Sequence, residues 1–371
     1  MDFALTDEQL ELQKELRRFL TNHSADAAVR KQLDDPSGYD RELWQRMGGE
    51  LGLQGLAIPE QFGGSGFTFV ELGLVIEELG RALTVSPFLG SCVMAATLVQ
   101  AVGNDAACSE LLPGIASGER VATVALAEDS GSWQLDDVTL TASNSGADWV
   151  LDGHKSYVLD GAAADTLLVI ARTPAGAAVF VVDGRAPGLD RTPMATLDLT
   201  RKLARLEFSA TPARLLAEGG EAAAAVASML DLTSIALAAE SVGGNAKVLE
   251  MAVEYAKVRE QFGRPIGSFQ AIKHKCAAML VDVESSRSAA YYALWAAATG
   301  HEDVPVVAPL VKAHCVDTYL AGAGENVQIH GGIGFTWEHS AHLYLKRAKS
   351  SQALLGDSDL HRQLLAERIG I

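Results

Sequence analysis

Two stretches in the last third of the chain carry residues suited to holding a phosphate-rich ligand. The first reads VREQFGRPIGSFQAI and contains Arg259 and Gln270; the second reads QIHGGIGF and contains Gln328, Gly331 and Gly332. A guanidinium forms paired hydrogen bonds with phosphate oxygens, and a side-chain amide offers a donor and an acceptor to a ring or a ribose. A glycine pair lets the backbone approach a ligand closely. Together these residues predict a grip on a cofactor, whereas each taken alone is also typical of a surface charge or a helix stop.

Helical patterns surround both stretches and set where these residues would lie. Apolar residues at helical spacing predict four long helices over residues 222–260, 266–299, 305–330 and 337–355. The turns between them are short, and short turns favour antiparallel neighbours, so we expect a helical bundle. Arg259 then lies where the first of these helices ends, and its guanidinium can reach a ligand there.

The rest of the chain has a helical part and a strand-rich part. Thr6 and Gln9 form a capping box, which predicts a helix from about residue 7, and helical spacing continues for roughly a hundred residues. From about Val121 to Phe208 the period becomes two, which predicts short antiparallel strands. We therefore expect an α+β protein with three domains: a helical domain over 1–119, a β-domain over 120–217 and a helical bundle over 218–371.

Composition and charge exclude several classes of protein. The 371 residues are 48% hydrophobic and carry a formal net charge of −17, which argues against a nucleic-acid or anionic-membrane surface, because such surfaces need a broad positive field. The four cysteines show no spacing suited to zinc, so no metal site is predicted. The N-terminal stretch lacks an apolar signal segment and no apolar run approaches a membrane span, so a cytoplasmic setting is expected.

Together, the two stretches resemble the C-terminal domain of the acyl-CoA dehydrogenase family, flavoproteins that desaturate acyl-CoA thioesters. The similarity extends to GLAIPEQFGGSG at residues 55–66 and ELGLVIEELGRAL at 71–83, which resemble the N-terminal domain of the family, and to AEDSG at 127–131 and DGHKSYVLDGAAAD at 152–165, which resemble its middle domain. The resemblance implies an N-terminal helical domain, a middle β-barrel-like domain and a C-terminal four-helix bundle. It also implies FAD bound at a subunit interface in a dimer of dimers, an acyl-CoA substrate, and an electron-transferring flavoprotein that accepts the electrons.

The resemblance assigns cofactor contacts to single residues of the bundle. Arg259, Gln270 and the loop from Gln328 to Gly332 match family residues that reach across to the FAD held mainly by the adjacent subunit. Asp357 stands where the family has a threonine that contacts the flavin. These residues make up the predicted cofactor-binding set of this chain.

The middle-domain positions that contact the isoalloxazine ring differ from the family pattern. Ala127 and Leu159 stand where family members carry threonines whose hydroxyls contact the ring, and Tyr157 stands where they carry a tryptophan. Two hydroxyl donors are therefore missing, and only an aromatic side chain remains. The resemblance implies a weakened hold on the flavin ring within this chain.

Most members of the family remove the substrate α-proton with a glutamate, and neither position that carries it has a carboxylate here. By register, the usual position is Leu355, and the position used by a minority is Thr233. Glu240 is the first remaining candidate for a general base, since it lies seven residues after Thr233 at nearly the same angle, roughly 10 Å further along a helix, within an apolar run. Asp357 is a second candidate, although by register it replaces a threonine that contacts the flavin. The alternative interpretation of Glu240 is an ion pair with a cation of a neighbouring helix.

The cofactor contacts of the bundle match the family, whereas the ring contacts and the base do not. This contrast leads to one main hypothesis and three alternatives. The chain is expected to be one subunit of a heteromeric FAD-dependent acyl-CoA dehydrogenase, in which a homologous partner subunit supplies the catalytic base and the isoalloxazine pocket. A homotetramer that acts through Glu240 is the first alternative. A flavin monooxygenase or oxidase of the same fold is the second, and a flavin-free scaffold subunit is the third.

Overall fold

The structure is a computed structural model that describes residues 5–35, 37–145 and 148–371. The chain forms two compact units. The helical unit combines the described residues up to Lys31 with Phe69–Thr84 and Ser234–Ile371, and the sheet unit combines Gln32–Thr68 with Val85–Thr233. Each unit has its own core.

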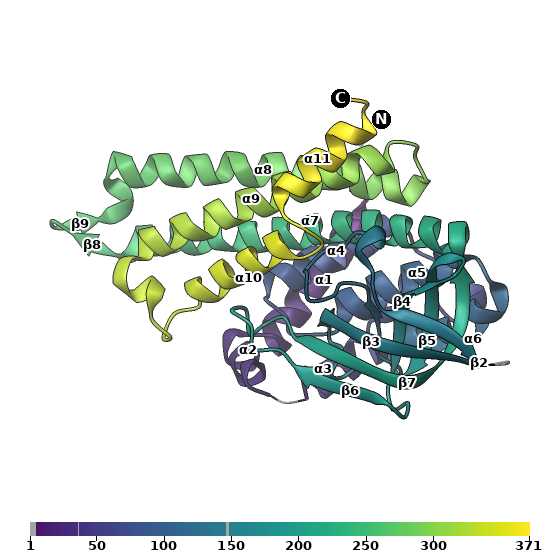
Figure 1. Cartoon of the computed structure of the whole chain (residues 1–371). Helices are drawn as coiled ribbons and strands as arrows, with labels where there is room; N and C mark the ends of the chain where they lie inside the picture. Colours follow the sequence, from purple (N-terminus) through teal and green to yellow (C-terminus); the bar gives the residue numbers. More distant parts are fainter. Residues whose placement is uncertain (1–4, 36, 146–147) are drawn as a thin grey trace. The chain divides into compact units, whose positions relative to one another are not determined.

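The helical unit is built from long helices that run side by side (Figure 1). Its elements are α1 (Asp7–His23), most of α2 (Asp26–Leu33), α4 (Phe69–Arg81), the second half of α7 (Gly219–Val258), the β8–β9 hairpin (Glu260–Gln261 and Arg264–Pro265), α8 (Gln270–Thr299), α9 (Val304–His330), α10 (Ala341–Ala353) and α11 (Ser358–Arg368). Helix α9 packs against α8, α10 and α11. The predicted helical bundle is confirmed.

The start of α1 follows the sequence pattern closely. The Thr6 side chain accepts a hydrogen bond from the Gln9 backbone N–H, and the Gln9 side chain accepts one from the Thr6 N–H, at 3.2 and 3.0 Å. This reciprocal pair satisfies two backbone donors that a helix N-terminus otherwise leaves without a partner. The predicted start at about residue 7 is confirmed.

Helices α4 and α7 cross at glycines, which allows unusually close packing. A Cβ atom at Gly243 of α7 would lie 1.8 Å from the backbone oxygen of Glu77, and one at Gly80 of α4 would lie 2.3 Å from the backbone oxygen of Glu240. Any side chain at either position therefore forces the helices apart. This crossing fixes the positions of Glu77 and Glu240 in the core of the helical unit.

Glu77 is a carboxyl group in the core of the helical unit. It is 3% exposed, its Oε2 accepts a hydrogen bond of 2.9 Å from the Tyr291 hydroxyl, and its Oε1 lies 3.8 Å from Arg287 Nε. Burial raises the pKa of this carboxyl to about 7, although Arg287 and Tyr291 oppose the rise. The folded protein therefore binds a proton at Glu77 more tightly than the unfolded chain does.

Replacing Glu77 with glutamine is expected to stabilise the protein above pH 7. The stabilising proton of the native carboxyl is held at low pH and lost as the pH rises from about 4.5 through about 7, so the native protein loses stability over that window while the variant does not. The difference should reach about 2 to 3 kcal/mol at pH 8. Urea unfolding at pH 5 and pH 8 measures it, with the exposed Glu11→Gln as the control. Identical pH dependence in both variants would show that Glu77 titrates normally.

The sheet unit contains a closed β-barrel flanked by helices (Figure 1). Its strands are β1 (Ala122–Ala125), β2 (Thr141–Ser145), β3 (Asp148–Leu159), β4 (Thr166–Thr173), β5 (Gly176–Asp183), β6 (Leu189–Pro193) and β7 (Leu203–Glu218). The order is β1-β4-β2-β3-β7-β5, and β5 also pairs with β4, which closes the ring. Its helices include α3 (Arg41–Gly49), α5 (Ala96–Val102), α6 (Asp105–Ala116) and the π-helix Leu89–Ala95. The α+β class with a barrel-like middle part is confirmed.

Two boundaries differ from the sequence prediction. The strands were expected to end near Phe208, but β7 continues to Glu218 because its second half pairs with β3 and β5 to complete the ring. The last predicted helix, 337–355, is shorter, and a further helix, α11, follows it from Ser358. Within the described residues, α7 alone has the length and apolar character of a membrane span, and 61% of that stretch is buried, as in the core helix of a globular protein.

Candidate cofactor-binding site

Arg259 lies where α7 ends and the β8–β9 hairpin begins. Its N–H donates to the Tyr255 carbonyl at 2.9 Å, and its carbonyl accepts from the Ile266 N–H at 2.7 Å, so its backbone is fixed. The turn of the hairpin places Phe262 and Gly263 at φ of +53° and +75°, as in a type I′ turn. The Arg259 side chain is exposed and its guanidinium has no bonded partner in the described parts of the chain. Its donors are therefore available to a ligand.

Gln270 is the first residue of α8, and the start of this 30-residue helix is uncapped. Phe269 occupies the N-cap position and provides no side-chain hydrogen bond. Backbone N–H groups at such a helix start carry partial positive charge and favour an anion. The guanidinium of Arg264 stacks over the Phe269 ring at 4.2 Å, which places a second cation beside this helix start.

The end of α9 supplies the remaining predicted contacts. Gln328 is exposed in the last turn, and the chain then enters a short 3-10 helix, Gly331–Phe335. Gly331 has φ +63° and ψ −142°, a combination that residues other than glycine avoid. No atom lies within 4 Å of where a Cβ would stand at Gly331 or Gly332. The backbone of this turn is therefore open to close approach by a ligand.

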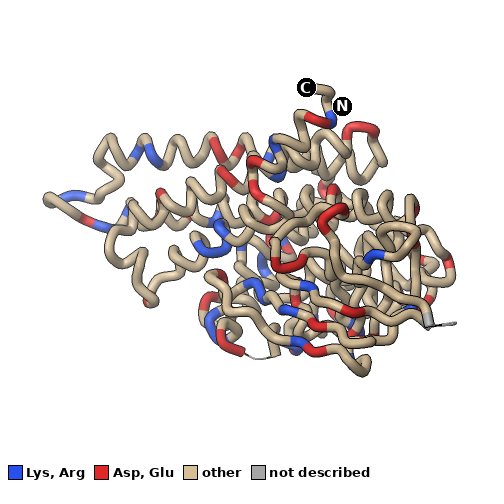
Figure 2. The backbone as a smooth tube through the Cα atoms, viewed as in Figure 1, with Lys and Arg blue, Asp and Glu red and all other residues tan. Residues whose placement is uncertain are grey.

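The structure brings five of the six predicted cofactor residues to one end of the bundle. The Tyr255 ring of α7 stacks on the His330 ring of α9 at 4.2 Å, and Lys275 of α8 pairs with Glu325 of α9. These contacts join the end of α7, the start of α8 and the end of α9. We call this region the bundle end and define it by Arg259, Gln270, Gln328, Gly331 and Gly332. Lys and Arg residues of the hairpin and of the first turns of α8 gather there (Figure 2).

Large apolar side chains are exposed around the bundle end. They are Val258 (73% exposed), Phe262 (92%), Ile333 (45%), Phe335 (79%) and Trp337 (57%). Exposed apolar patches next to polar residues mark surfaces that bind other proteins or ligands. The bundle end therefore combines phosphate-binding donors with an apolar contact surface.

Asp357, the sixth predicted cofactor residue, lies elsewhere in the helical unit. It is the N-cap of α11, where its side chain accepts a hydrogen bond of 2.9 Å from the Leu360 N–H. The adjacent Gly356 carbonyl accepts a hydrogen bond from Lys312 of α9. Lys312 precedes Gln328 by sixteen residues, roughly 24 Å of helix. Asp357 and the bundle end therefore cannot contact the same few atoms of a cofactor.

Neither family position for the base offers a carboxylate. Leu355 is 4% exposed with φ +63°, and its carbonyl lies 3.1 Å from His361 Nε2. Burial lowers the pKa of His361 to about 4, so this ring is neutral at physiological pH. Thr233 is fully buried, and its hydroxyl donates to the Met229 carbonyl at 2.6 Å. The turn at Leu355 thus adopts a conformation rare for a leucine and presents no carboxylate.

Glu240 forms a buried ion pair, the alternative interpretation drawn from the sequence. Its Oε1 accepts a hydrogen bond of 2.8 Å from Arg347 Nη1 of α10, and its Oε2 accepts one of 3.3 Å from the Ser351 hydroxyl. All three residues are buried. The pairing is confirmed, whereas a catalytic role for Glu240 remains a prediction.

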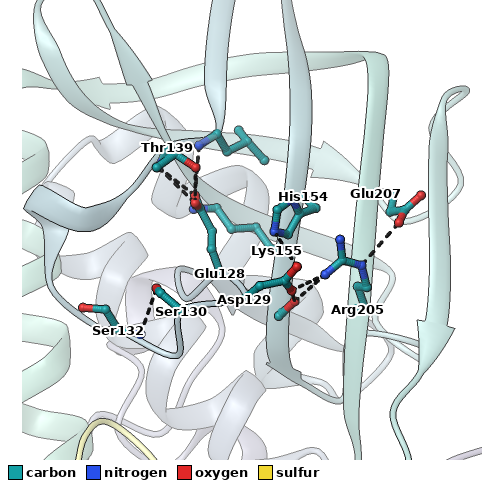
Figure 3. Close-up of polar contacts among 11 residues, drawn as sticks. Glu128, Asp129, Ser130, Ser132, Thr139, His154, Lys155, Arg205 and Glu207 are labelled. Carbon is teal, nitrogen blue, oxygen red and sulfur yellow. Dashed lines mark hydrogen bonds and ion pairs between the residues drawn. The ribbon is translucent and has the colours of Figure 1, made fainter.

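In the sheet unit, the segments expected to face the flavin ring carry few groups that could bond to it. Ala127 and Leu159 are buried, at 1% and 3% exposure, and Tyr157 is half-buried with φ +58°. Between them lies a buried ion pair in which Lys155 Nζ donates to Glu128 Oε1 at 2.8 Å (Figure 3). Burial opposes ionisation of Glu128, but hydrogen bonds from Lys155 and its neighbours outweigh it and lower its pKa to about 2. Sequence reasoning missed this pair, which holds the two segments together.

A second polar cluster occupies the outer side of the same two segments. Asp129 Oδ1 accepts a hydrogen bond of 2.5 Å from the Ser156 hydroxyl and another from Arg205, and Asp129 Oδ2 lies 3.2 Å from His154 Nε2 (Figure 3). Arg205 also pairs with Glu207 at 3.3 Å. The polar groups of these segments are thus engaged with one another inside the sheet unit.

Comparison with known proteins covers nearly the whole chain. Three family models match: "Acyl-CoA dehydrogenase, N-terminal domain" at residues 6–119, "Acyl-CoA dehydrogenase, middle domain" at 123–210 and "Acyl-CoA dehydrogenase, C-terminal domain" at 220–370. Acyl-CoA dehydrogenase IpdE2 of Mycobacterium tuberculosis is 34% identical over 94% of this chain and 93% of that protein.

Two solved structures are similar in sequence and in fold. A chain of a variant of the Tcur3481–Tcur3483 steroid ACAD is 33% identical with a TM-score of 0.88 over 98% of both chains. A chain of the ChsE4–ChsE5 complex of Mycobacterium tuberculosis is 28% identical with a TM-score of 0.90 over 100% of this chain and 99% of that one. Because all three family domains match in order, the chain belongs to the acyl-CoA dehydrogenase family of FAD-dependent oxidoreductases that act on CH–CH bonds.

Proposed function

We propose that this chain binds the phosphates and adenosine of an FAD whose ring is held by a homologous partner chain, in an assembly that desaturates an acyl-CoA thioester. One observation carries the proposal: the bundle end keeps its donors and glycine turn together on an exposed surface, while Leu355 and Thr233 leave both base positions without a carboxylate. The chain thus retains nucleotide-binding groups and lacks a carboxylate at both family positions for the base.

The bundle end fits the nucleotide part of FAD chemically. The Arg259 guanidinium and the uncapped start of α8 supply donors to phosphate oxygens, and the Gln270 and Gln328 amides suit a ribose or an adenine. The Gly331–Gly332 turn leaves room for these contacts. When bound, FAD supplies the acceptor for the hydride that leaves the substrate β-carbon. Asp357, which caps α11 away from the bundle end, is proposed to contact a different flavin from the one bound there.

The proton chemistry is assigned to the partner chain. A general base must accept the α-proton of the thioester, and a leucine or a threonine cannot serve as one. The exposed aromatic residues around the bundle end provide a surface on which the partner chain would cover the nucleotide. The similar Tcur3481–Tcur3483 and ChsE4–ChsE5 structures are, by name, associations of two different proteins, which supports a heteromeric assembly for this chain.

Three finer features belong to the same proposal. We propose a dimer of dimers as the assembly and an electron-transferring flavoprotein as the electron acceptor, as the family resemblance implies. The name steroid ACAD, which one similar structure carries, favours a ring-bearing acyl group as the first substrate class to test.

Counting flavins in the purified assembly tests the proposed function. The chain should be produced alone and together with its homologous partner, and FAD should be quantified by absorbance after release. We expect a colourless chain alone and one FAD for each pair of chains in the assembly. One FAD for every chain would instead favour the homotetramer. No flavin in either sample would favour the scaffold, and flavin that consumes oxygen after reduction by an acyl-CoA would favour an oxidase or monooxygenase.

The homotetramer with Glu240 as its base is the second candidate. The position of Glu240 in the core of the helical unit favours it, because a base must be shielded from water. Its ion pair with Arg347 opposes it, since the carboxylate would have to exchange a charged partner for a substrate proton. Replacement of Glu240 therefore distinguishes the two candidates.

A further inference from the structure

The helical unit contains a pocket that no part of the proposed function uses. It has a volume of about 580 Å³ and lies among the ends of α1 and α4, the start of α2, the last third of α7 and the segment that leads into α10. Sites for small organic ligands commonly have this size. All of its lining residues belong to the helical unit, so its shape depends on a single core.

One part of the pocket is apolar. Leu20, Val29, Leu83, Met251 and the ring of Tyr344 line it. Leu83 adopts φ +49° at the end of α4, in a position where glycine is the usual residue. Its backbone is held there by hydrogen bonds from the Leu83 N–H to Gly80 and from the Thr84 N–H to Leu79. A leucine at this strained position places its side chain in the wall of the pocket.

The carboxylates of the pocket are all paired. Glu78 is 1% exposed and receives both Nε and Nη2 of Arg17, at 2.9 and 2.5 Å. Asp26 Oδ2 accepts a hydrogen bond of 2.6 Å from Nε of Arg30, which is not among the residues that line the pocket. The pocket therefore has little capacity left to accept hydrogen bonds from a ligand.

The cations at one end of the pocket, in contrast, outnumber the carboxylate that they share. Arg81 and Lys247 share a single carboxylate, Glu250, with Lys247 Nζ at 2.6 Å from its Oε1 and Arg81 Nη2 on its Oε2. The remaining N–H groups of these two side chains have no acceptor within the described ranges of the chain. Over the whole lining, three cations (Arg17, Arg81 and Lys247) face three carboxylates (Asp26, Glu78 and Glu250). Arg17 pairs with Glu78, and Asp26 pairs with Arg30 outside the lining, so at one end of the pocket two cations are left with Glu250 alone. One unit of positive charge and several donors remain for a ligand at that end.

We propose that this pocket binds a free carboxylic acid with a hydrocarbon body, its carboxylate on Arg81 and Lys247 and its chain against Leu20, Val29, Leu83 and Met251. A carboxylate accepts hydrogen bonds and donates none, which matches the excess of donors. A single spare positive charge suits a monoanion and does not suit the several phosphate charges of a CoA thioester. The ligand class is therefore the free acid rather than its CoA ester.

Calorimetric titration of the full-length protein, in the assembly in which it purifies, tests this site. Octanoate is the first probe, and 1-octanol, with the same chain and no charge, is the second. We expect saturable binding of octanoate with one site per chain and binding of octanol that is weaker by about tenfold or more. Absence of saturable octanoate binding, or equal binding of octanol, would overturn the proposal.

Lys247→Met separates this pocket from other sites. We expect octanoate affinity to fall about tenfold in this variant and to remain unchanged in Lys14→Met, which removes an exposed lysine paired with Glu11 in the same i,i+3 manner and lies outside the pocket. Thermal melting confirms that both variants fold. Met251→Trp, which fills the apolar part, should also abolish binding. Equal loss in both lysine variants, or a loss of octanoyl-CoA binding in Lys247→Met with octanoate unaffected, would contradict the assignment.

Discussion

Replacing Arg259 with alanine is expected to lower the FAD affinity of the purified assembly by about ten- to a hundredfold for each hydrogen bond lost. The reason is that a charge-assisted hydrogen bond contributes about 1.5 to 3 kcal/mol. Arg259 is exposed, its backbone is fixed between α7 and the β8–β9 hairpin, and its guanidinium has no bonded partner in the residues that the structure describes. Its removal should therefore cost cofactor binding and leave stability nearly unchanged. FAD titration of the stripped assembly measures the first effect, and thermal melting without FAD measures the second.

Lys257→Ala is the matched control for Arg259. Lys257 lies two residues earlier, is exposed, and pairs with Glu254 at 2.6 Å, so its replacement removes the same charge from nearly the same place. We expect FAD affinity to stay within about twofold of the native value, because an exposed charge without direct contact is largely screened. If both variants lose affinity equally, only general electrostatics acts at the bundle end. Native FAD affinity in the Arg259→Ala assembly would contradict the proposed nucleotide site.

Replacing Glu240 with glutamine is expected to lower the free energy of unfolding by about 3 to 5 kcal/mol. The change removes the negative charge that Glu240 places against the buried guanidinium of Arg347, and breaking a buried ion pair in this way is strongly destabilising. If Glu240 is structural, the folded variant assembly should still show bleaching of its flavin absorbance when acyl-CoA is added. If Glu240 is the base, bleaching should disappear while FAD stays bound.

A double variant separates charge burial from catalysis. Glu240→Leu together with Arg347→Met removes both charges, and apolar replacement of a whole buried pair is often nearly neutral. We expect its stability to return to within about 1 kcal/mol of the native protein. The recovery should come with active flavin reduction. A stable double variant whose FAD is no longer reduced by acyl-CoA would instead identify Glu240 as the base.

Local sequence patterns predicted much of the helical unit because the interactions that fix it are local. The capping box at Thr6, the long helices and the end of α7 at Val258 all depend on residues within one or two turns. Helix α11 was missed because its sequence, SDLHRQLLAER, is short and weakly apolar, and its N-cap signal at Asp357 was assigned to cofactor binding instead. The extension of β7 was missed because it depends on partners in β3 and β5 that lie far away in the chain.

The same contrast between local and long-range interactions explains which sites could be predicted from the sequence. Arg259, Gln270 and Gln328 could be grouped from the sequence because short turns place consecutive helix ends together, although their grouping also drew on the family resemblance. Glu240 and Arg347 are more than a hundred residues apart in the sequence. The sequence therefore allowed an ion pair at Glu240 but could not distinguish it from a catalytic base. The 580 Å³ pocket has no sequence signature, because it arises where five elements from four separate stretches of the chain meet.

The tip of the β8–β9 hairpin carries an exposed aromatic ring that affects how the chain behaves without its partner. Phe262 is 92% exposed at a backbone angle that a phenylalanine rarely adopts, and within the chain its ring makes an edge-on contact with the Phe269 ring at 6.1 Å, so burial contributes little to keeping it. In the proposed heteromeric assembly, a copy of the chain without its partner would leave this apolar tip exposed to solvent. Such unpartnered copies should aggregate or be degraded, so the proposal predicts that the two chains are made in balanced amounts.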